Sequence, residues 1–223
     1  MRRFKITDLV YGIIFTLLFI SIAVVITVNF RPLYYMDIKL LDIEASSGLD
    51  KATIRENYDA LIDYSSPFFR GALRFPSLDA SESGLQHFAE VKDIFTGFYV
   101  IAAICLIAGI AIIICKSRIK DYSYLLVSAI MAIVLPLLLA LFIAIDFDTA
   151  FVIFHKIFFR NDYWLFDPVT DPVITILPAE FFMHCAIMII LIVVLFSLLF
   201  ILLYLRARKH IGIKYRKIKG LNL

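Results

Sequence analysis

The side chains that could carry chemistry in this sequence are its histidines. There are four of them, all outside the long apolar stretches. His210 lies in the basic C-terminal segment, and the other three are His87, His155 and His184. Histidine has an unperturbed pKa of about 6.5, so it can accept and return a proton near neutral pH. The sequence has no GxSxG, HExxH or glycine-rich phosphate-binding motif, which removes support for serine hydrolysis, zinc proteolysis and nucleotide chemistry. Acid–base catalysis by histidine remains.

One histidine lies within an aromatic segment, residues 151–168. Around His155 this segment carries Phe151, Phe154, Phe158, Phe159, Tyr163, Trp164 and Phe166. Such a cluster can form the wall of a pocket for an apolar substrate. It can equally form an aromatic belt at a bilayer surface, or one face of a helix that lies in the membrane plane. Composition leaves these interpretations open.

No metal or cofactor is expected at these residues. Three histidines and an aspartate could hold zinc, but no two candidate ligands have the i, i+3 or i, i+4 spacing of a preformed site on one helix. His184, which precedes Cys185 at the edge of an apolar stretch, is expected to be packed or interfacial.

The elements that must position the histidines are mostly membrane helices. The 223-residue chain is 62% hydrophobic, against about 45–50% in soluble domains. Four uncharged stretches have the roughly 20 apolar residues that a helix needs to cross a bilayer. These stretches are residues 9–30, 97–115, 124–145 and 186–205. We therefore expect an all-α membrane protein with four transmembrane helices.

The distribution of charge predicts the orientation. Residues 1–8, 116–123 and 206–223 hold 13 of the 22 Lys and Arg and only two acids, Asp8 and Asp121. Because basic segments remain in the cytoplasm, we expect both termini to be cytoplasmic. The two long polar segments then lie on the external face of the membrane, and His87, His155 and His184 with them.

The long polar segments are expected to form a small external cap built from two insertions. The first insertion should contain an amphipathic helix at residues 50–64 with Asp50 as its N-cap, preceded by an extended or strand-like segment at residues 33–44. A helix at residues 85–95 should then run unbroken into the second span.

In the second insertion, Asp148 should cap a helix that presents an apolar face and carries His155 on its flank. Turn-forming pairs such as Asp167-Pro168 should then keep the chain irregular before the last span.

The expected order of segments along the chain is as follows: a cytoplasmic N-terminus and first span at residues 1–30, the external cap at 31–96, the second and third spans at 97–145, the external aromatic segment at 146–185, the fourth span at 186–205 and a basic cytoplasmic tail at 206–223.

Two histidine-containing segments have a distinctive composition. The first is Ser83-Gly-Leu-Gln-His87 with Phe88 and Glu90, and the second is Phe154-His-Lys-Ile-Phe-Phe with Asn161-Asp162, Trp164 and Asp167-Pro168. The pair resembles the paired motifs of the bacterial lipoprotein intramolecular transacylases. Four spans, a long first external segment, an aromatic second one and a basic tail extend the resemblance over most of the chain.

The resemblance implies a membrane acyltransferase that acts on diacylglyceryl-modified bacterial lipoproteins, without a cofactor or nucleic acid. The acyl chain would move from the sn-2 oxygen of the glyceryl group to the α-amino group of the same lipoprotein's N-terminal cysteine, leaving a lyso-form lipoprotein. The family's two catalytic histidines correspond here to His87 and His155. The reaction needs a base for the amine proton, stabilisation of an oxyanion and an acid for the leaving oxygen.

We expect His155 to act as the base towards the amine, and His87 to stabilise the oxyanion and donate the proton. The residues assigned to substrate binding, of which Asn161 or Asp162 can also orient a histidine, are Phe154, Phe158, Asn161, Asp162, Tyr163, Trp164 and Phe166. Two other functions stay open. One is a polytopic accessory protein that binds a partner through its cap, and the other is a lipid or lipoprotein hydrolase that uses a histidine-activated water.

Overall fold

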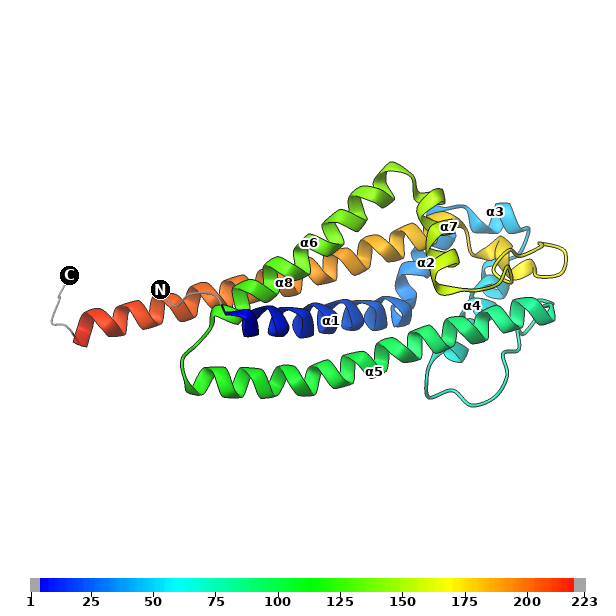
Figure 1. Cartoon of the computed structure of the whole chain (residues 1–223). Coiled ribbons are helices and arrows are strands. Elements are labelled where there is room, and N and C mark those ends of the chain that lie inside the picture. Colours follow the sequence, from blue (N-terminus) through cyan, green and yellow to red (C-terminus); the bar gives the residue numbers. More distant parts are fainter. Residues whose placement is uncertain (1–4, 219–223) are drawn as a thin grey trace. The chain divides into compact units, whose positions relative to one another are not determined.

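The chain forms helices and connecting loops. The computed structural model describes residues 5–218, apart from the side chains of residues 135, 139, 142–144 and 211–218, and no strand occurs in this part of the chain. The helices in Figure 1 are α1 (Ile6–Asn29), α2 (Arg31–Leu40), α3 (Ile43–Ser47), α4 (Lys51–Ser65), α5 (Glu82–Arg118), α6 (Ser123–Ile145), α7 (Phe147–Phe158), the 3₁₀ helix η1 (Pro172–Ile176) and α8 (Ala179–Ile218).

Three of the described helices, α1, α5 and α8, are long and apolar enough to cross a membrane. The fourth span, expected at residues 124–145, falls within α6, a helix of 23 residues with Pro136 inside it. Helix α6 is not one of the three helices named above. Three of the four predicted spans are therefore supported, and the fourth stays a prediction.

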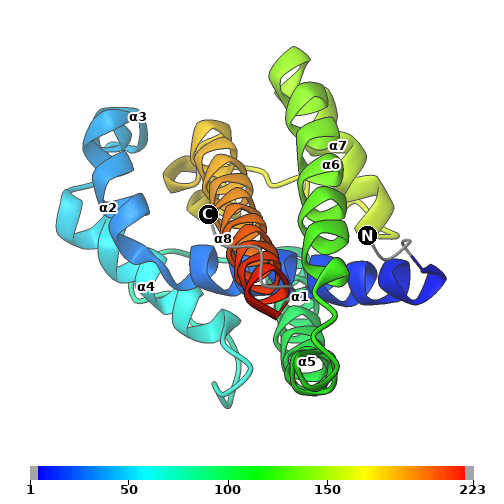
Figure 2. The same cartoon turned by 90° about the vertical axis from the view of Figure 1, so that its left-hand side faces the viewer.

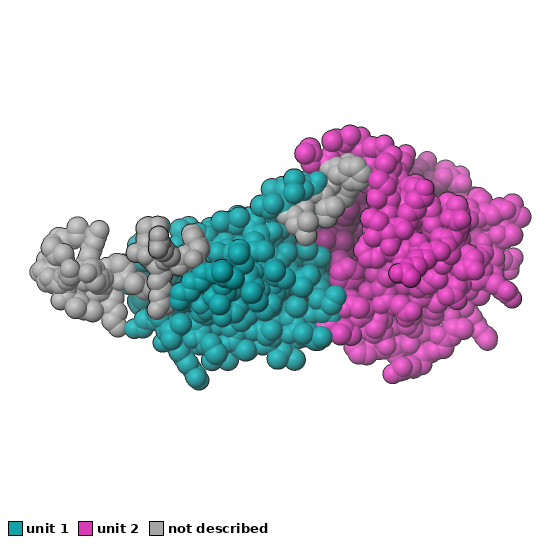
Figure 3. Space-filling view, in the orientation of Figure 1, with its two compact units in different colours: residues 1–23, 101–139, 190–223 teal, residues 24–100, 140–189 magenta. Residues whose placement is uncertain are grey.

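The chain divides into two compact units, which are coloured separately in Figure 3. Unit 1 consists of residues 1–23, 101–139 and 190–223, and unit 2 consists of residues 24–100 and 140–189. Both candidate catalytic histidines belong to unit 2.

Unit 1 contains a buried group of charges. Lys116 Nζ lies 3.0 Å from Asp121 Oδ2 and 3.7 Å from Asp8 Oδ1, and all three side chains are less than a tenth exposed. Burial alone would raise the pKa of Asp121, but hydrogen bonds from Ser123 and Lys116 outweigh it and hold this pKa at about 2. The two acids that interrupt the basic segments of the sequence therefore pair with one lysine.

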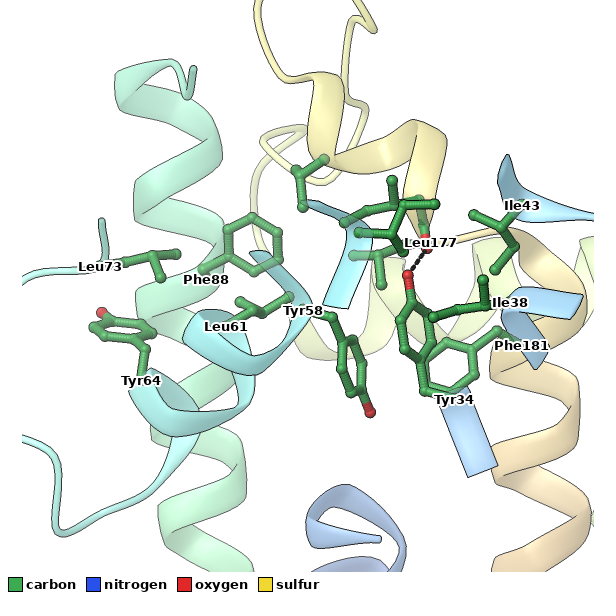
Figure 4. Close-up of a cluster of buried hydrophobic side chains, with 13 residues drawn as sticks. Tyr34, Ile38, Ile43, Tyr58, Leu61, Tyr64, Leu73, Phe88, Leu177 and Phe181 are labelled. Atoms are coloured by element: carbon green, nitrogen blue, oxygen red, sulfur yellow. Dashed lines mark hydrogen bonds between the residues drawn. The ribbon is translucent and has the colours of Figure 1, made fainter. Parts of the chain in front are cut away.

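Unit 2 has a hydrophobic core to which both long polar segments contribute. Figure 4 shows the ring of Tyr34 from α2 close to residues of α4 and α8, and its hydroxyl donates a 2.6 Å hydrogen bond to the carbonyl oxygen of Ile176 in η1. The Tyr34 and Tyr58 rings stack with centroids 3.7 Å apart, and Phe181 packs edge-on against both. Phe88 of α5 joins the same cluster. The two insertions thus pack as one body, whose external position stays a prediction.

Two local predictions for the first insertion are confirmed. Asp50 caps α4, because its Oδ1 accepts from the backbone N–H groups of Ala52 and Thr53 at 2.8 and 3.0 Å. The helix expected at residues 85–95 continues without a break into the second apolar stretch as α5. Since α5 has 37 residues and a span needs roughly 20, its first turns lie outside the apolar stretch.

Two other local predictions are wrong. Residues 33–44 do not form an extended segment but lie in α2, in α3 and in the turn between them, and α2 lies beside α4 in Figure 2. The weak alternation there was misleading, because Tyr34 and Ile38 stand four residues apart and are buried together on one helical face. The cap of α7 is Asp146, which accepts from Thr149 N at 3.0 Å, while Asp148 lies in the first turn.

Candidate active site

The start of α5, which carries His87, is fixed by Asp171 from the second insertion. Asp171 accepts hydrogen bonds from the backbone N–H and the hydroxyl of Ser81, both at 2.8 Å, and from the Thr170 hydroxyl at 2.9 Å. The Ser81 hydroxyl oxygen accepts from Gly84 N at 2.9 Å. A Cβ at Gly84 would lie 2.2 Å from Asp171 Oδ1, so α5 can begin this close to Asp171 only with glycine there.

Helix α7 positions His155 on its inner side. His155 is 8% exposed, whereas Phe154, Ile157 and Phe158 on the outer side are 46%, 70% and 50% exposed. Asp146 at the N-cap and Asp148 in the first turn favour the helix start, because negative charge is stabilised there. An amphipathic helix thereby turns one titratable side chain inward and leaves an apolar stripe on its other face.

A hydrogen bond defines the tautomer of His155. Its Nδ1 lies 2.8 Å from the backbone carbonyl oxygen of Phe151, one turn earlier in α7. A carbonyl oxygen can only accept, so Nδ1 carries the proton and donates it. In the neutral ring Nε2 then holds a lone pair. His155 is therefore arranged to accept a proton at Nε2.

His87 and His155 come together within an aromatic shell. Their ring centroids are 5.9 Å apart and their planes are inclined by 32°. The ring of Phe159 lies 4.7 Å from His87 and 5.5 Å from His155. Trp164 lies 4.8 Å from His155, and Phe166 lies 5.5 Å from His87. The two histidines are thus held at short range by rings that exclude water.

Burial lowers the pKa of both histidines. For His87 burial is the largest cause and the neighbouring His155 adds to it, while Glu90 opposes it, and the resulting pKa is about 4. Burial also lowers the pKa of His155, with partial opposition from the hydrogen bond to the Phe151 carbonyl. Both imidazoles are therefore neutral at pH 7, and each has one nitrogen that donates and one that accepts.

Two polar atoms in this shell are buried without a hydrogen-bond partner in the described part of the chain, His87 Nδ1 and Trp164 Nε1. Leaving a buried donor or acceptor unpaired costs about 1–3 kcal/mol. Such groups in a native structure call for an explanation, and a catalytic role is one of them. A bound substrate with polar groups would recover this energy.

A carboxylate lies one turn beyond His87 on α5. The Asn161 side-chain amide donates to both oxygens of Glu90, at 2.9 and 3.2 Å. Asn161 Oδ1 accepts from the backbone N–H of Tyr163 at 3.1 Å, which shapes the turn that leads to Trp164. The bond between Glu90 and Asn161 therefore ties α5 to the aromatic segment beside the two histidines.

The residues expected to bind substrate fall into two groups. Trp164 and Phe166 contact the histidine rings, as given above, and Asn161 contacts Glu90 rather than a histidine. The other four are more open to solvent. Phe154 contacts the His155 ring edge-on at 5.4 Å, and Phe158 packs on Phe154 at 4.6 Å. Tyr163 is 44% exposed and Asp162 is exposed in a turn. Among the described residues, Phe158, Tyr163 and Asp162 make no contact with a histidine ring.

Phe159 and Glu90 were not among the residues assigned from the sequence. Phe159 is 5% exposed and touches both histidine rings. Helical spacing could have indicated both residues, because Phe159 follows His155 by four positions and Glu90 follows His87 by three.

His184 does not join the pair. Its Nδ1 lies 2.9 Å from each carboxylate oxygen of Asp37, which is 1% exposed. Within residues 5–218, no three His, Cys, Asp or Glu side chains gather in a way that could hold a metal ion. His184 therefore serves the packing of α8 against α2.

The fold and the site define a helical membrane protein with two neutral, buried histidines in an aromatic shell. The sequence model of the family "Lipoprotein intramolecular transacylase Lit" matches residues 9–182. The chain belongs to this family, and the resemblance stated from its motifs is confirmed. Its members are enzymes that transfer an acyl group within a lipoprotein.

Comparison with solved structures supports the same family. The chain is similar to the membrane-integral lipoprotein intramolecular transacylase Lit from Bacillus cereus, with a TM-score of 0.90 and 38% identity over 92% of this chain and 96% of that one. It is also similar to two variants of that protein in which a histidine is replaced by arginine or by alanine. Both have a TM-score of 0.85 and 37% identity, over 93% and 92% of this chain and 92% and 94% of theirs. The comparison with curated proteins gave no match.

Proposed function

We propose that this enzyme moves an acyl chain from the sn-2 oxygen of a lipoprotein's diacylglyceryl group to the α-amino group of its own N-terminal cysteine. His87 and His155 perform the acid–base chemistry at the external face of the bacterial cell membrane, and both termini are cytoplasmic. The observation that carries the proposal is the neutral histidine pair at 5.9 Å, with His155 Nδ1 engaged and Nε2 free to accept.

The reaction uses His155 as the base. Its Nε2 takes a proton from the amine as the amine nitrogen bonds to the ester carbonyl carbon. The carbonyl oxygen becomes an oxyanion, which accepts a hydrogen bond from the N–H of His87. When the bond to the sn-2 oxygen breaks, the imidazolium of His155 returns the proton to that oxygen. The product has the same atoms as the substrate.

The low pKa of His87 alters one role expected from the sequence. A neutral imidazole donates a hydrogen bond well, but it loses its remaining proton only at great cost. His87, with a pKa of about 4, is therefore an oxyanion stabiliser, and the proton for the leaving oxygen comes from His155. A neutral histidine used as an electrophile is a known solution for carbonyl chemistry.

The aromatic shell supports transfer rather than hydrolysis. Both reacting groups belong to one molecule, and well-oriented intramolecular reactions reach effective molarities of roughly 10⁵–10⁸ M. His87 and His155 are only 5% and 8% exposed, so competing water is largely excluded. Trp164, Phe166 and the neighbouring aromatic residues hold the glyceryl-cysteine head, and the acyl chains lie along the apolar helices.

Mass spectrometry of a lipopeptide with two differently labelled acyl chains tests the reaction. We expect an N-acyl, monoacylglyceryl product of unchanged mass, formed without a cofactor, a lipid donor or released fatty acid. Acetylation of the substrate's α-amino group should stop the reaction. A mass loss equal to one fatty acid would establish a hydrolase instead, and exchange of label between molecules would exclude the intramolecular route.

Substitutions at His155 test its role. In His155→Asn the side-chain amide can still donate to the Phe151 carbonyl, but nothing replaces Nε2. We expect this variant to fold and to lose at least about 10²-fold in activity, the lower end for acid–base catalysis. The matched control is His184→Asn, which can still donate to Asp37 and should be far milder. Equal losses at the two positions would refute the assignment.

A further inference from the structure

The proposed substrate brings a positive charge to a site whose histidines carry none. An α-amino group has a pKa of about 7.7–8.0, so it is mostly an ammonium group at neutral pH. Both site histidines are neutral there, because burial lowers the pKa of each. A buried or half-buried cation needs an opposite charge or several acceptors. The amine therefore needs a partner other than His87 and His155.

The carboxylate of Glu90 has no ion-pair partner in the described part of the chain. Across residues 5–218 the carboxylates in ion pairs are aspartates, and Glu90 is in none. Arg160, which precedes its partner Asn161, is exposed. Glu90 is bound by the neutral amide of Asn161 at 2.9 and 3.2 Å and by a longer contact of 3.4 Å from Gln86.

The position of Glu90 suits contact with the same substrate as the histidines. It is half-buried and follows His87 by three residues on α5, so the two side chains share one helix face at about 5–6 Å between their Cβ atoms. Its charge reaches the site, because it acts on the pKa of His87. Asn161 holds the carboxylate from the segment between His155 and Trp164, opposite α5.

We infer that Glu90 binds the α-amino group of the substrate's N-terminal cysteine. This inference rests on the proposed function and adds a substrate-binding residue to it. Asn161 orients the carboxylate by donating to both of its oxygens. Gln86 contacts Oε1, so Oε2 keeps a lone pair for an ammonium N–H. The carboxylate holds the ammonium group beside the histidine pair. The group loses one proton to solvent to become the neutral amine, and the carboxylate then stabilises the positive charge that grows on nitrogen as the amine attacks the ester carbon and before His155 Nε2 takes the second proton.

Binding of two unreactive analogues to the full-length protein in lipid nanodiscs tests this role. Both are glyceryl-cysteine lipopeptides with an ether in place of the sn-2 ester, and one has a free α-amino group while the other is N-acetylated. At pH 6.5 we expect the wild-type protein to bind the free amine roughly tenfold more tightly or better, the size of one charge-assisted hydrogen bond. The preference should disappear near pH 9.5, where the amine is neutral.

Two variants complete the test. Glu90→Gln should abolish the preference at pH 6.5 while leaving the affinity for the acetylated analogue unchanged. Asp93→Asn, which removes an exposed carboxylate three residues further along α5, should retain it. A preference that survives in Glu90→Gln would assign the amine to the aromatic shell and overturn the inference.

The wild-type measurement decides the matter even if Glu90→Gln does not fold, because equal binding of both analogues at pH 6.5 excludes recognition of the charged amine. Failure of the proposed function has a different signature, the absence of an N-acyl product from the ester substrate. A wild-type protein that makes this product but binds the two analogues equally would refute the role of Glu90 alone.

Discussion

Replacement of His87 by phenylalanine separates catalysis from stability. The new ring can keep the contacts that His87 makes with Phe159 and Phe166 at 4.7 and 5.5 Å. It removes the imidazole and the unpaired buried Nδ1. We expect His87→Phe to lose at least about 10²-fold in activity. Its stability at pH 7.5 should nevertheless stay near that of the wild type, because relief of the unpaired atom, about 1–3 kcal/mol, offsets the larger ring, about 1–3 kcal/mol.

The change in folding stability with pH tests the burial of His87 more quantitatively than the stability at a single pH does. In the unfolded chain His87 takes up a proton near pH 6.5, but in the folded protein burial lowers its pKa to about 4. The unfolded state therefore binds more protons between these values, and folding stability falls as pH decreases from about 6.5 to 4. From pH 7.5 to 4.5 this costs the wild type about 2–3 kcal/mol. His87→Phe should lack that loss.

Thermal unfolding in a nonionic detergent can measure the difference, with the fluorescence of Trp164, the single tryptophan, as the signal. By the scaling for chains of this length, the wild type should lose roughly 5–10 °C more in Tm than His87→Phe between pH 7.5 and 4.5. The control is His184→Phe, which should be less stable at pH 7.5 because it leaves the buried Asp37 unpaired. An acid loss in His87→Phe equal to that of the wild type would refute the argument that His87 is buried in the neutral form.

Three further predictions follow from other parts of the molecule. Gly84→Ala should destabilise the protein by about 1–3 kcal/mol, since its Cβ would displace Asp171; an unchanged unfolding temperature would contradict this. Lys116→Met should cost about 3–5 kcal/mol by removing the ammonium group that balances the buried carboxylates of Asp8 and Asp121, with partial rescue by Asp121→Asn, and an additive double variant would exclude the coupling. A cysteine introduced near Ser47, with the native cysteines replaced, should react with an impermeant reagent in intact cells, whereas labelling only after permeabilisation would reverse the proposed topology.

The helical membrane class could be predicted from the sequence because it depends on local properties. Apolar stretches of about 20 residues must be helical in lipid, since no other partner exists for their backbone groups. Helix α4 could likewise be predicted with its Asp50 cap, because a cap needs only residues a few positions away. Where local signals were weak, as in residues 33–44, the contacts of Tyr34 with Tyr58 and Ile176 decided for helix.

The sequence indicated which residues belong to the site but not how they are arranged. Residue type indicated His87, His155 and His184, and the family resemblance selected His87 and His155. The aromatic residues around His155 indicated a hydrophobic wall. Their ring separation of 5.9 Å depends on the packing of α5 against α7 and the aromatic segment, and no spacing rule relates residues so far apart in the chain. The tautomer of His155 is likewise set by its contact with the Phe151 carbonyl. Both rings are neutral because burial lowers their pKa.

Charged residues show most clearly the difference between what the sequence predicts and what depends on the tertiary structure. Hydropathy treats Asp8, Lys116 and Asp121 as loop or helix-end charges, and it places Glu90 on a polar helix face. Only the tertiary structure buries Asp8 and Asp121 beside the ammonium group of Lys116 and joins Glu90 of the first insertion to Asn161 of the second. Sequence periodicity reports which face of a helix is apolar. The partner of a buried charge depends on how whole helices pack. The free-energy cost of removing that charge from water must be balanced by a group that the fold brings next to it, and this group can come from a distant part of the sequence.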